Sequence, residues 1–509
     1  MIDVIIVGGG TAGCVLARRL SENPERSVLL LEAGPDYSTP ETTPVEILDA
    51  KLPPMSHDWG YVAADQSTPE RPVFLPRGKL IGGSSATNYA FAMRARPADH
   101  DEWAERGLTG WGWEDVLPLY KEMETDLGGD ATWHGTDGPF RVTRPGWDEV
   151  APTARAFAEA CRALSIPVVD DVNAPTAPGF GIVPRNQADG VRESLALTYL
   201  NPVRERPNLQ IRGRTLVDRV LLEGDRAVGV VLSSGEELRA GHVILAAGAF
   251  NSPAILMRSG IGAADDLTEH GIAVRHELPG VGRNLMEHPV FWNIYAAKPS
   301  DAKVDTIFQS CLSYRIRDEE RDYDLHLIPS SLLPAEDVPP QYVPPAADHP
   351  TGFDFVIFVS NMRPRSRGRV RLADADPNTA PQIELNLYGD PADAEIVAEG
   401  VRLARRLAQQ TPLADYLVEE RAPGATVEDA DLVDAVQRAV THYNHPSGTC
   451  RMGVPGDPGA VVDVAGRVHG LHGLSVIDAS IIPVLPRVAI NPTTVLIAEK
   501  LAKAFDAAS

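Results

Sequence analysis

The sequence has 509 residues, a formal net charge of −23 and a pI near 5.0. A chain of this length predicts two or three domains with a substantial apolar core. Glycine and proline, with 43 residues each, fall short of the share that is typical of disordered chains. The acidic balance argues against a nucleic-acid partner, because contacts with phosphates need clustered lysine and arginine.

The four cysteines lie far apart in the sequence and show no zinc-type spacing. This distribution argues against a disulfide framework or a cysteine-built metal site, and it indicates a reducing compartment. No basic segment precedes the first apolar residues, and no apolar run approaches the ~18 residues of a membrane helix. We therefore expect a cytoplasmic protein without a membrane span.

The first 32 residues predict a βαβ unit. Residues 3–7 form an apolar strand, a helical pattern covers 11–21, and a second apolar strand covers 27–31 and ends at Glu32. Strands without polar residues are typical of a parallel sheet that is covered on both faces.

Further along the chain, poor periodicity between 34 and 110 predicts irregular structure. Helices are expected at 151–164, at 390–410 with Asp390 as the N-cap, and after Asn491-Pro492 at the C-terminal end. Alternating segments beyond residue 291 suggest an antiparallel sheet. The predicted strands cover 209–212, 216–222, 227–232, 242–246, 353–359, 369–372 and 474–477.

A Gly8-x-Gly10-x-x-Gly13 motif stands at the first strand-to-helix turn. Glycines there allow a tight turn and a close approach to a pyrophosphate, and the helix N-terminus offers N–H groups to the phosphates. Glu32, about 20 residues further on, can accept hydrogen bonds from ribose hydroxyls. The pattern favours one bound dinucleotide, FAD or NAD rather than NADP, over a plain glycine-rich turn.

Four separated motifs resemble those of the glucose–methanol–choline (GMC) flavoprotein oxidoreductases. The first of them is the dinucleotide motif itself. The others are Arg77–Asn88 (RGKLIGGSSATN), Gly248–Pro253 running on to Ser259–Gly262, and a C-terminal group made of His445-Pro446-x-Gly448-Thr449, Asp478-Ala479-Ser480 and Asn491-Pro492. The resemblance covers almost the whole chain, and within the family it is to choline-dehydrogenase-like members.

The resemblance implies an α/β FAD-binding domain of Rossmann type and an α+β substrate domain with a largely antiparallel sheet. The FAD-binding domain would comprise 1–155, 205–290 and 440–509, and the substrate domain 156–204 and 291–439. By the same resemblance, Ser84 and Asn88 would lie near the flavin, Val217 near the adenine, and Asp478 with Ala479 near the ribityl-pyrophosphate. The residues expected at the cofactor are Gly8, Gly10, Thr11, Ala12, Gly13, Glu32, Ala33, Gly83, Ser84, Asn88, Val217, Asp478, Ala479, Pro492 and Thr493.

Thr87 occupies the position at which covalently flavinylated relatives have a histidine. Threonine has no ring nitrogen that could bond to the flavin, so we expect non-covalent FAD.

His445 matches the family's active-site histidine. A neutral imidazole, whose ordinary pKa is about 6.5, can take the hydroxyl proton of an alcohol. An isolated histidine would more often be structural. His442 and His445 are also spaced like metal ligands, but the sequence shows no third ligand beside them, so we expect no metal.

Asn491 matches the second active-site position, at which it could hold the alcohol oxygen. It is also a good helix N-cap before Pro492, and both roles can coexist. The N-terminal turn of that helix, with Thr493, could stabilise negative charge on the flavin.

The expected activity is oxidation of an alcohol, most readily a primary one, to the aldehyde, with oxygen or a quinone-type compound as electron acceptor. Two alternatives stay open: a cyanohydrin lyase on the same fold, and a flavin-binding redox partner without turnover. The identity of the alcohol does not follow from the sequence.

Overall fold

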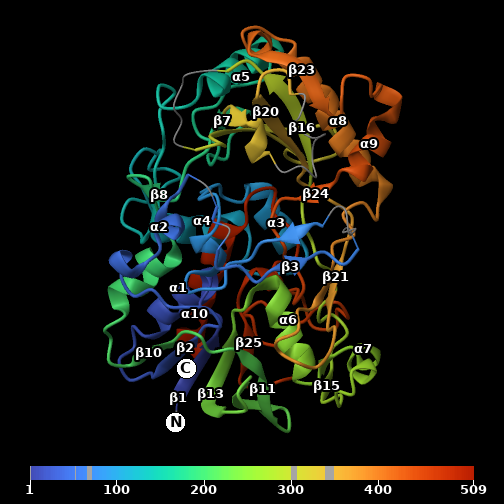
Figure 1. The fold of residues 1–509 in the computed structure, drawn as a ribbon. Helices are drawn as coiled ribbons and strands as arrows, with labels where there is room; N and C mark the ends of the chain where they lie inside the picture. Colours follow the sequence, from blue (N-terminus) through green and yellow to red (C-terminus); the bar gives the residue numbers. More distant parts are fainter. Residues whose placement is uncertain are drawn as a thin grey trace.

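The computed structural model describes residues 2–51, 53–54, 56–65, 72–299, 306–338 and 349–508. Its strands form two large sheets that lie in separate layers, with both chain termini in the layer of the first sheet (Figure 1). The first sheet has seven strands in the order β10-β2-β1-β13-β12-β11, with β25 beside β13. These strands are β1 (Ile2–Val7), β2 (Val28–Leu31), β10 (Leu209–Arg212), β11 (Val217–Glu223), β12 (Arg226–Leu232), β13 (Glu237–Leu245) and β25 (Leu474–Val476).

The centre of this sheet is parallel, because β1 pairs in parallel with both β2 and β13. Helix α1 (Thr11–Leu20) connects β1 to β2 and packs against α10 (Asn491–Ala508). An ion pair joins the two helices, with Arg19 Nε 2.7 Å from Glu499 Oε2. The first and last helices of the chain therefore pack against each other in the layer of the first sheet. Helix α6 (Gly248–Arg258) follows β13, and the short α7 (Ala264–Glu269) comes after it.

The second sheet is antiparallel and has eight strands, with the main order β23-β16-β20-β18-β17-β7. Leu327, Val359 and Phe291 belong to one face, which packs with α5 (Pro152–Ala163), α8 (Pro391–Ala408) and α9 (Leu432–Arg438) in an apolar core. The strands are β7 (Phe180–Ile182), β16 (Pro289–Ala297), β17 (Ser310–Tyr314), β18 (Leu325–Pro329), β19 (Leu333–Pro334), β20 (Phe353–Asn361), β23 (Leu417–Ala422) and β24 (Thr441–His442).

The opposite face of this sheet is turned towards the first layer. Val290, Ser360, His326 and Ser313 are paired across four neighbouring strands and so share this face. Beside them, Phe308 and Met362 pack with Phe91 and Val488, which come from segments outside the sheet. The boundary between the two layers therefore combines apolar side chains with a buried histidine.

Most predicted elements are confirmed, including the opening βαβ unit and α8, whose N-cap Asp390 accepts from the N–H of Ala392 at 3.0 Å. The expectation of irregular structure over 34–110 is wrong for α3 (Pro97–Glu105), whose hydrophobic periodicity is weak; α4 (Trp113–Met123) was not foreseen either. The predicted domain boundaries stay a prediction.

The remaining short strands are β3 (Tyr61–Val62), β4 (Phe74–Leu75), β5 (Glu124–Asp126), β6 (Phe140–Val142), β8 (Gln187–Ala188), β9 (Val191–Arg192), β14 (Ile261–Gly262), β15 (His276–Glu277), β21 (Arg369–Arg371) and β22 (Gln382–Glu384), with helix α2 (Val45–Leu48).

None of the helices in the described ranges combines the length and the apolar character that a membrane crossing requires.

Candidate active site

The turn between β1 and α1 needs glycine because backbone segments approach each other closely there. A side chain at Gly13 would place its Cβ 1.9 Å from the carbonyl oxygen of Gly8. The first turn of α1 contains no acidic residue, and its N–H groups have no acceptors within the helix. Thr11, Ala12 and Gly13 therefore offer backbone donors to an anion at a positive helix end.

Glu32 lies at the end of β2 and closes this turn. Its carboxylate accepts from the N–H groups of Gly9 and Gly34, each at 2.8 Å. Burial raises the pKa of Glu32 to about 7, and the hydrogen bonds from Gly34 and Gly9 act in the opposite direction. The backbone oxygen of Glu32 accepts from Thr215 at 2.7 Å, which brings the start of β11, and so Val217, towards Glu32 and Ala33.

The loop with Gly82 and Gly83 lies directly on the dinucleotide turn. The N–H of Gly82 donates to the carbonyl of Gly9 at 2.7 Å, and a Cβ on Gly83 would lie 2.7 Å from Cα of Gly10. The polar side chains of this segment make local contacts. Ser84 Oγ accepts from the Gly78 N–H at 3.3 Å, and Asn88 Oδ1 accepts from the Ala90 N–H at 2.8 Å. The structure thus brings two motifs together that are about seventy residues apart in sequence.

Asp478 joins the C-terminal motif to the start of α6. Its buried carboxylate accepts from the hydroxyl of Ser252 at 2.6 Å and from the N–H groups of Gly248 at 2.8 Å and Ser480 at 2.7 Å. Burial raises the pKa of Asp478, and these hydrogen bonds oppose that effect. The carbonyl of Ala479 in turn accepts from the Gly448 N–H at 3.3 Å, which ties this segment to the loop that carries His445.

Asn491 begins α10 and contacts the N-terminus of α1. The hydroxyl of Thr11 donates to Asn491 Oδ1 at 3.0 Å. Nδ2 of Asn491 is buried and has no hydrogen-bond partner among the described residues. Pro492 and Thr493 follow as buried residues in the first turn. The structure therefore brings the N-termini of two helices together and leaves one amide donor between them unused.

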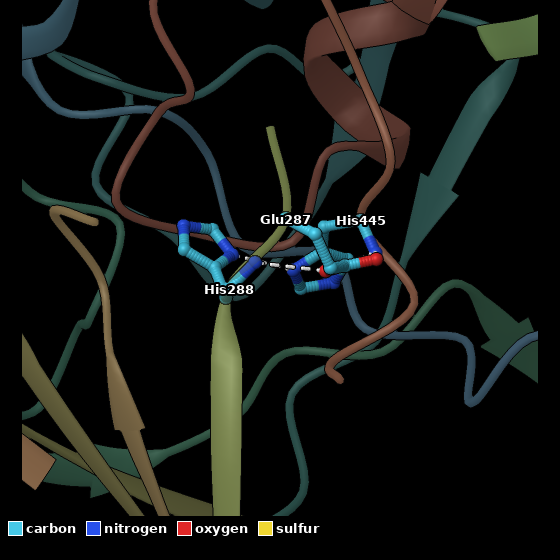
Figure 2. A group of neighbouring side chains, drawn as sticks. All are labelled: Glu287, His288 and His445. Atoms are coloured by element: carbon cyan, nitrogen blue, oxygen red, sulfur yellow. Dashed lines mark hydrogen bonds between the residues drawn. The ribbon is translucent and has the colours of Figure 1, made fainter. Parts of the chain in front are cut away.

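His445 lies in a cluster with Glu287 and His288, which immediately precede β16 (Figure 2). The backbone N–H of His445 donates to both carboxylate oxygens of Glu287 at 2.8 Å. Its Nδ1 lies 2.9 Å from Nδ1 of His288. The His445 ring is also 4.3 Å from the ring of Tyr443, centre to centre. With Nδ1 engaged, Nε2 is the ring nitrogen that is available to a substrate.

Burial favours the neutral form of His445. Burial lowers the pKa of His445 to about 4, Glu287 raises it, and Arg77 and His442 lower it. For Glu287, burial alone acts to raise the pKa, but His442, His445 and Arg77 together hold it below its ordinary value. The cluster therefore combines an ionised carboxylate with an uncharged imidazole near neutral pH. This pKa lies below the ordinary value of about 6.5 assumed from the sequence.

The sequence did not point to Glu287, His288 or His326. The expectation that no third residue of a metal-ligating type lies beside His442 and His445 is wrong, since Glu287 and His288 lie around His445. These groups are engaged in the hydrogen bonds given above. In the sequence, the signal for this part of the site was the pair of adjacent ionisable residues Glu287 and His288, directly before an apolar strand. Arg77 lies in a recognised motif, and its donation to Asn444 O at 3.2 Å and Oδ1 at 3.0 Å was not foreseen.

Several buried polar atoms near this cluster have no hydrogen-bond partner among the described residues. They include both ring nitrogens of His326, Nε2 of His288 and Oγ of Ser447. The His326 ring stacks on Tyr323 and lies 6.4 Å from the ring of Tyr443. Buried polar atoms are normally hydrogen-bonded, so these groups are suited to contact a polar ligand.

Two family models described as GMC oxidoreductase match residues 2–290 and 364–498. The chain belongs to the GMC oxidoreductase family. It is 37% identical to an uncharacterized GMC-type oxidoreductase of Rhodococcus erythropolis, over 98% of this chain and 97% of the relative. It is also 37% identical to an oxygen-dependent choline dehydrogenase of Chromohalobacter salexigens, over 98% and 94% of the two chains.

Solved structures of the family have the same fold. Pyridoxine 4-oxidase from Mesorbium loti superposes with a TM-score of 0.90 at 33% identity and covers 100% of this chain and 99% of its own. A formate oxidase superposes with a TM-score of 0.87 at 27% identity over 100% and 98% of the two chains. The predicted fold class, FAD-binding Rossmann type with an antiparallel substrate sheet, is confirmed.

GMC oxidoreductases bind FAD, and the residues of this chain fit that cofactor. The glycine turn and the N-terminus of α1 offer backbone donors to a pyrophosphate, and the acidic Glu32 follows at the end of β2. The unused Nδ2 of Asn491 lies where α1 and α10 begin. The chain is therefore an FAD-dependent enzyme of this family.

Proposed function

We propose that the protein oxidises an alcohol, most readily a primary one, to the aldehyde. The observation that carries this proposal is the buried, neutral His445, whose Nδ1 is engaged by His288 and whose Nε2 is left for a hydroxyl group. The name choline dehydrogenase, carried by relatives with 37% identity, supports a CH–OH group as the point of attack.

In the proposed reaction, Nε2 of His445 accepts the hydroxyl proton of the substrate. Nδ2 of Asn491, a buried donor without a partner among the described residues, donates a hydrogen bond to the substrate oxygen. FAD, when bound, supplies the hydride acceptor. Glu287 holds the backbone at His445 in place and balances the positive charge that the imidazole gains.

Anaerobic mixing of the FAD-loaded protein with a panel of primary alcohols tests this proposal. We expect at least one alcohol to bleach the flavin absorbance and to appear as its aldehyde. The electron acceptor is oxygen or a quinone-type compound, and the words "oxygen-dependent" and "oxidase" in the names of relatives favour oxygen. Timing the return of flavin absorbance in air, and then with a quinone, distinguishes the two.

The pH dependence of flavin reduction follows from the lowered pKa of His445. Burial disfavours the imidazolium and holds the pKa at about 4, so the base is neutral at higher pH and protonated below that value. We expect the reduction rate to be constant above pH ~6 and to fall as the pH drops through ~4–5. A pH series of anaerobic reductions measures this, and a midpoint at or above the ordinary value of about 6.5 would contradict it.

We further propose that FAD is held without a covalent bond, because Thr87 offers no ring nitrogen at the position of attachment in flavinylated relatives. Acid precipitation of the FAD-loaded protein should release the yellow flavin into the supernatant. Colour that stays with the pellet after washing would contradict this proposal.

The cytoplasm is the compartment that we propose. All four cysteines are buried free thiols, as a reducing environment would leave them.

A further inference from the structure

The contact between His445 and His288 allows only two arrangements of protons. Their Nδ1 atoms are 2.9 Å apart (Figure 2). In a hydrogen bond between two neutral imidazoles, one Nδ1 must carry the hydrogen and the other must offer its lone pair. Either His445 donates to His288 or His288 donates to His445.

The two arrangements differ in what they leave at Nε2 of His445. If His445 donates through Nδ1–H, its Nε2 carries a lone pair and can accept a proton. If His288 donates, Nε2 of His445 carries the hydrogen and cannot act as a base. The direction of one hydrogen bond therefore decides whether the ring can take the proton of an alcohol.

The surroundings of His288 suit it to be the acceptor. It is fully buried, and its backbone N–H donates to Glu287 Oε1 at 2.9 Å. Burial lowers its pKa well below the ordinary value, and the charges of His445, His326 and Arg363 act in the same direction. The backbone of Met362 acts in the opposite direction, but burial dominates and His288 is neutral. A neutral His288 can offer the lone pair of its Nδ1 to His445, and the proposed role of Nε2 of His445 as the base requires this arrangement.

We propose that His288 is a positioning residue that holds the ring hydrogen of His445 on Nδ1 and so keeps Nε2 free as the base. This inference rests on the proposed alcohol oxidation. In the proton step, the O–H bond of the alcohol breaks and an Nε2–H bond forms on His445. The ring becomes positively charged, and its Nδ1–H remains bonded to the neutral Nδ1 of His288.

Three variants test this role in the FAD-loaded protein. His288→Leu removes the acceptor, whereas His288→Asn offers an amide oxygen near the place of Nδ1. His242→Leu is the control, since His242 is a partly buried histidine that lies away from the site on β13, where it contacts Ser475 at 3.0 Å. We expect His288→Leu to slow flavin reduction about 10- to 100-fold, as for partners of metal-bound histidines. The apparent affinity for the alcohol should stay unchanged, His288→Asn should recover most of the rate, and His242→Leu should match the wild type.

A second readout does not depend on turnover. In holoenzyme with 15N-labelled histidine, the ring signals of His445, assigned through their loss in His445→Ala, should show hydrogen on Nδ1. In His288→Leu the hydrogen should move to Nε2.

Hydrogen on Nε2 of His445 in the wild type would overturn the inference, and so would a His288→Leu variant that is reduced at the wild-type rate. If no alcohol reduces the wild type, the proposed function fails by itself, and the position of the ring hydrogen still decides the role of His288.

Discussion

Replacement of His445 by alanine is expected to slow the reduction of bound flavin by an alcohol about 10²-fold or more, the usual contribution of a positioned general base. The variant should still bind FAD, because the contacts of Asp478, Gly83 and Glu32 do not involve the imidazole. The hydrogen bonds from the backbone of residue 445 to Glu287 also remain possible. Anaerobic stopped-flow absorbance measures the rate.

His472→Ala is a matched control for His445→Ala. It removes an imidazole that is 67% exposed and lies 3.9 Å from Asp225, on the surface. Its reduction rate should equal that of the wild type. If His445→Ala retains FAD and is reduced as fast as the control, His445 is not the base.

Replacement of Gly83 by alanine should weaken FAD binding about tenfold or more. The added Cβ would lie 2.7 Å from Cα of Gly10, so the Gly82-Gly83 loop and the dinucleotide turn must move apart. Overpacking of this kind costs about 1–3 kcal/mol, and each ~1.4 kcal/mol is a factor of ten in affinity. Titration of the FAD-free protein with FAD, followed by flavin fluorescence, measures the change.

Gly224→Ala separates this clash from backbone strain. Gly224 has φ +60, close to the φ +50 of Gly83, but no atom of the residues that the structure describes lies within 4 Å of its Cβ position. Both variants place an alanine in the left-handed backbone region, which costs about 1–2 kcal/mol, and only Gly83→Ala adds the clash. Equal FAD affinity in the two variants would show that the Gly83–Gly10 contact does not shape the cofactor site.

The opening βαβ unit and the closing helix could be predicted because their signals are local. The apolar strands 3–7 and 27–31 flank a glycine turn, and Asn491-Pro492 marks a helix start. The short helix α3 was missed because it is surrounded by irregular chain and has little amphipathic periodicity.

The residues around His445 could be predicted only in part. His445 itself matched a known motif, but Glu287 and His288 come from a segment about 160 residues earlier. They reach the site only because β24 pairs with the start of β16. His326 arrives from β18 through its pairing with Ser360 on β20. Such contacts follow from strand register across a whole sheet, which no local pattern encodes.

Anaerobic reduction by an alcohol with deuterium at the carbinol carbon tests most directly the claim that this protein transfers hydride from an alcohol deprotonated at His445. We expect a primary alcohol to bleach the flavin, its deuterated form to do so several times more slowly, and His445→Ala to lose most of the rate with either. A holoenzyme that keeps its flavin absorbance with every alcohol, or one bleached without any dependence on residue 445, would contradict the account.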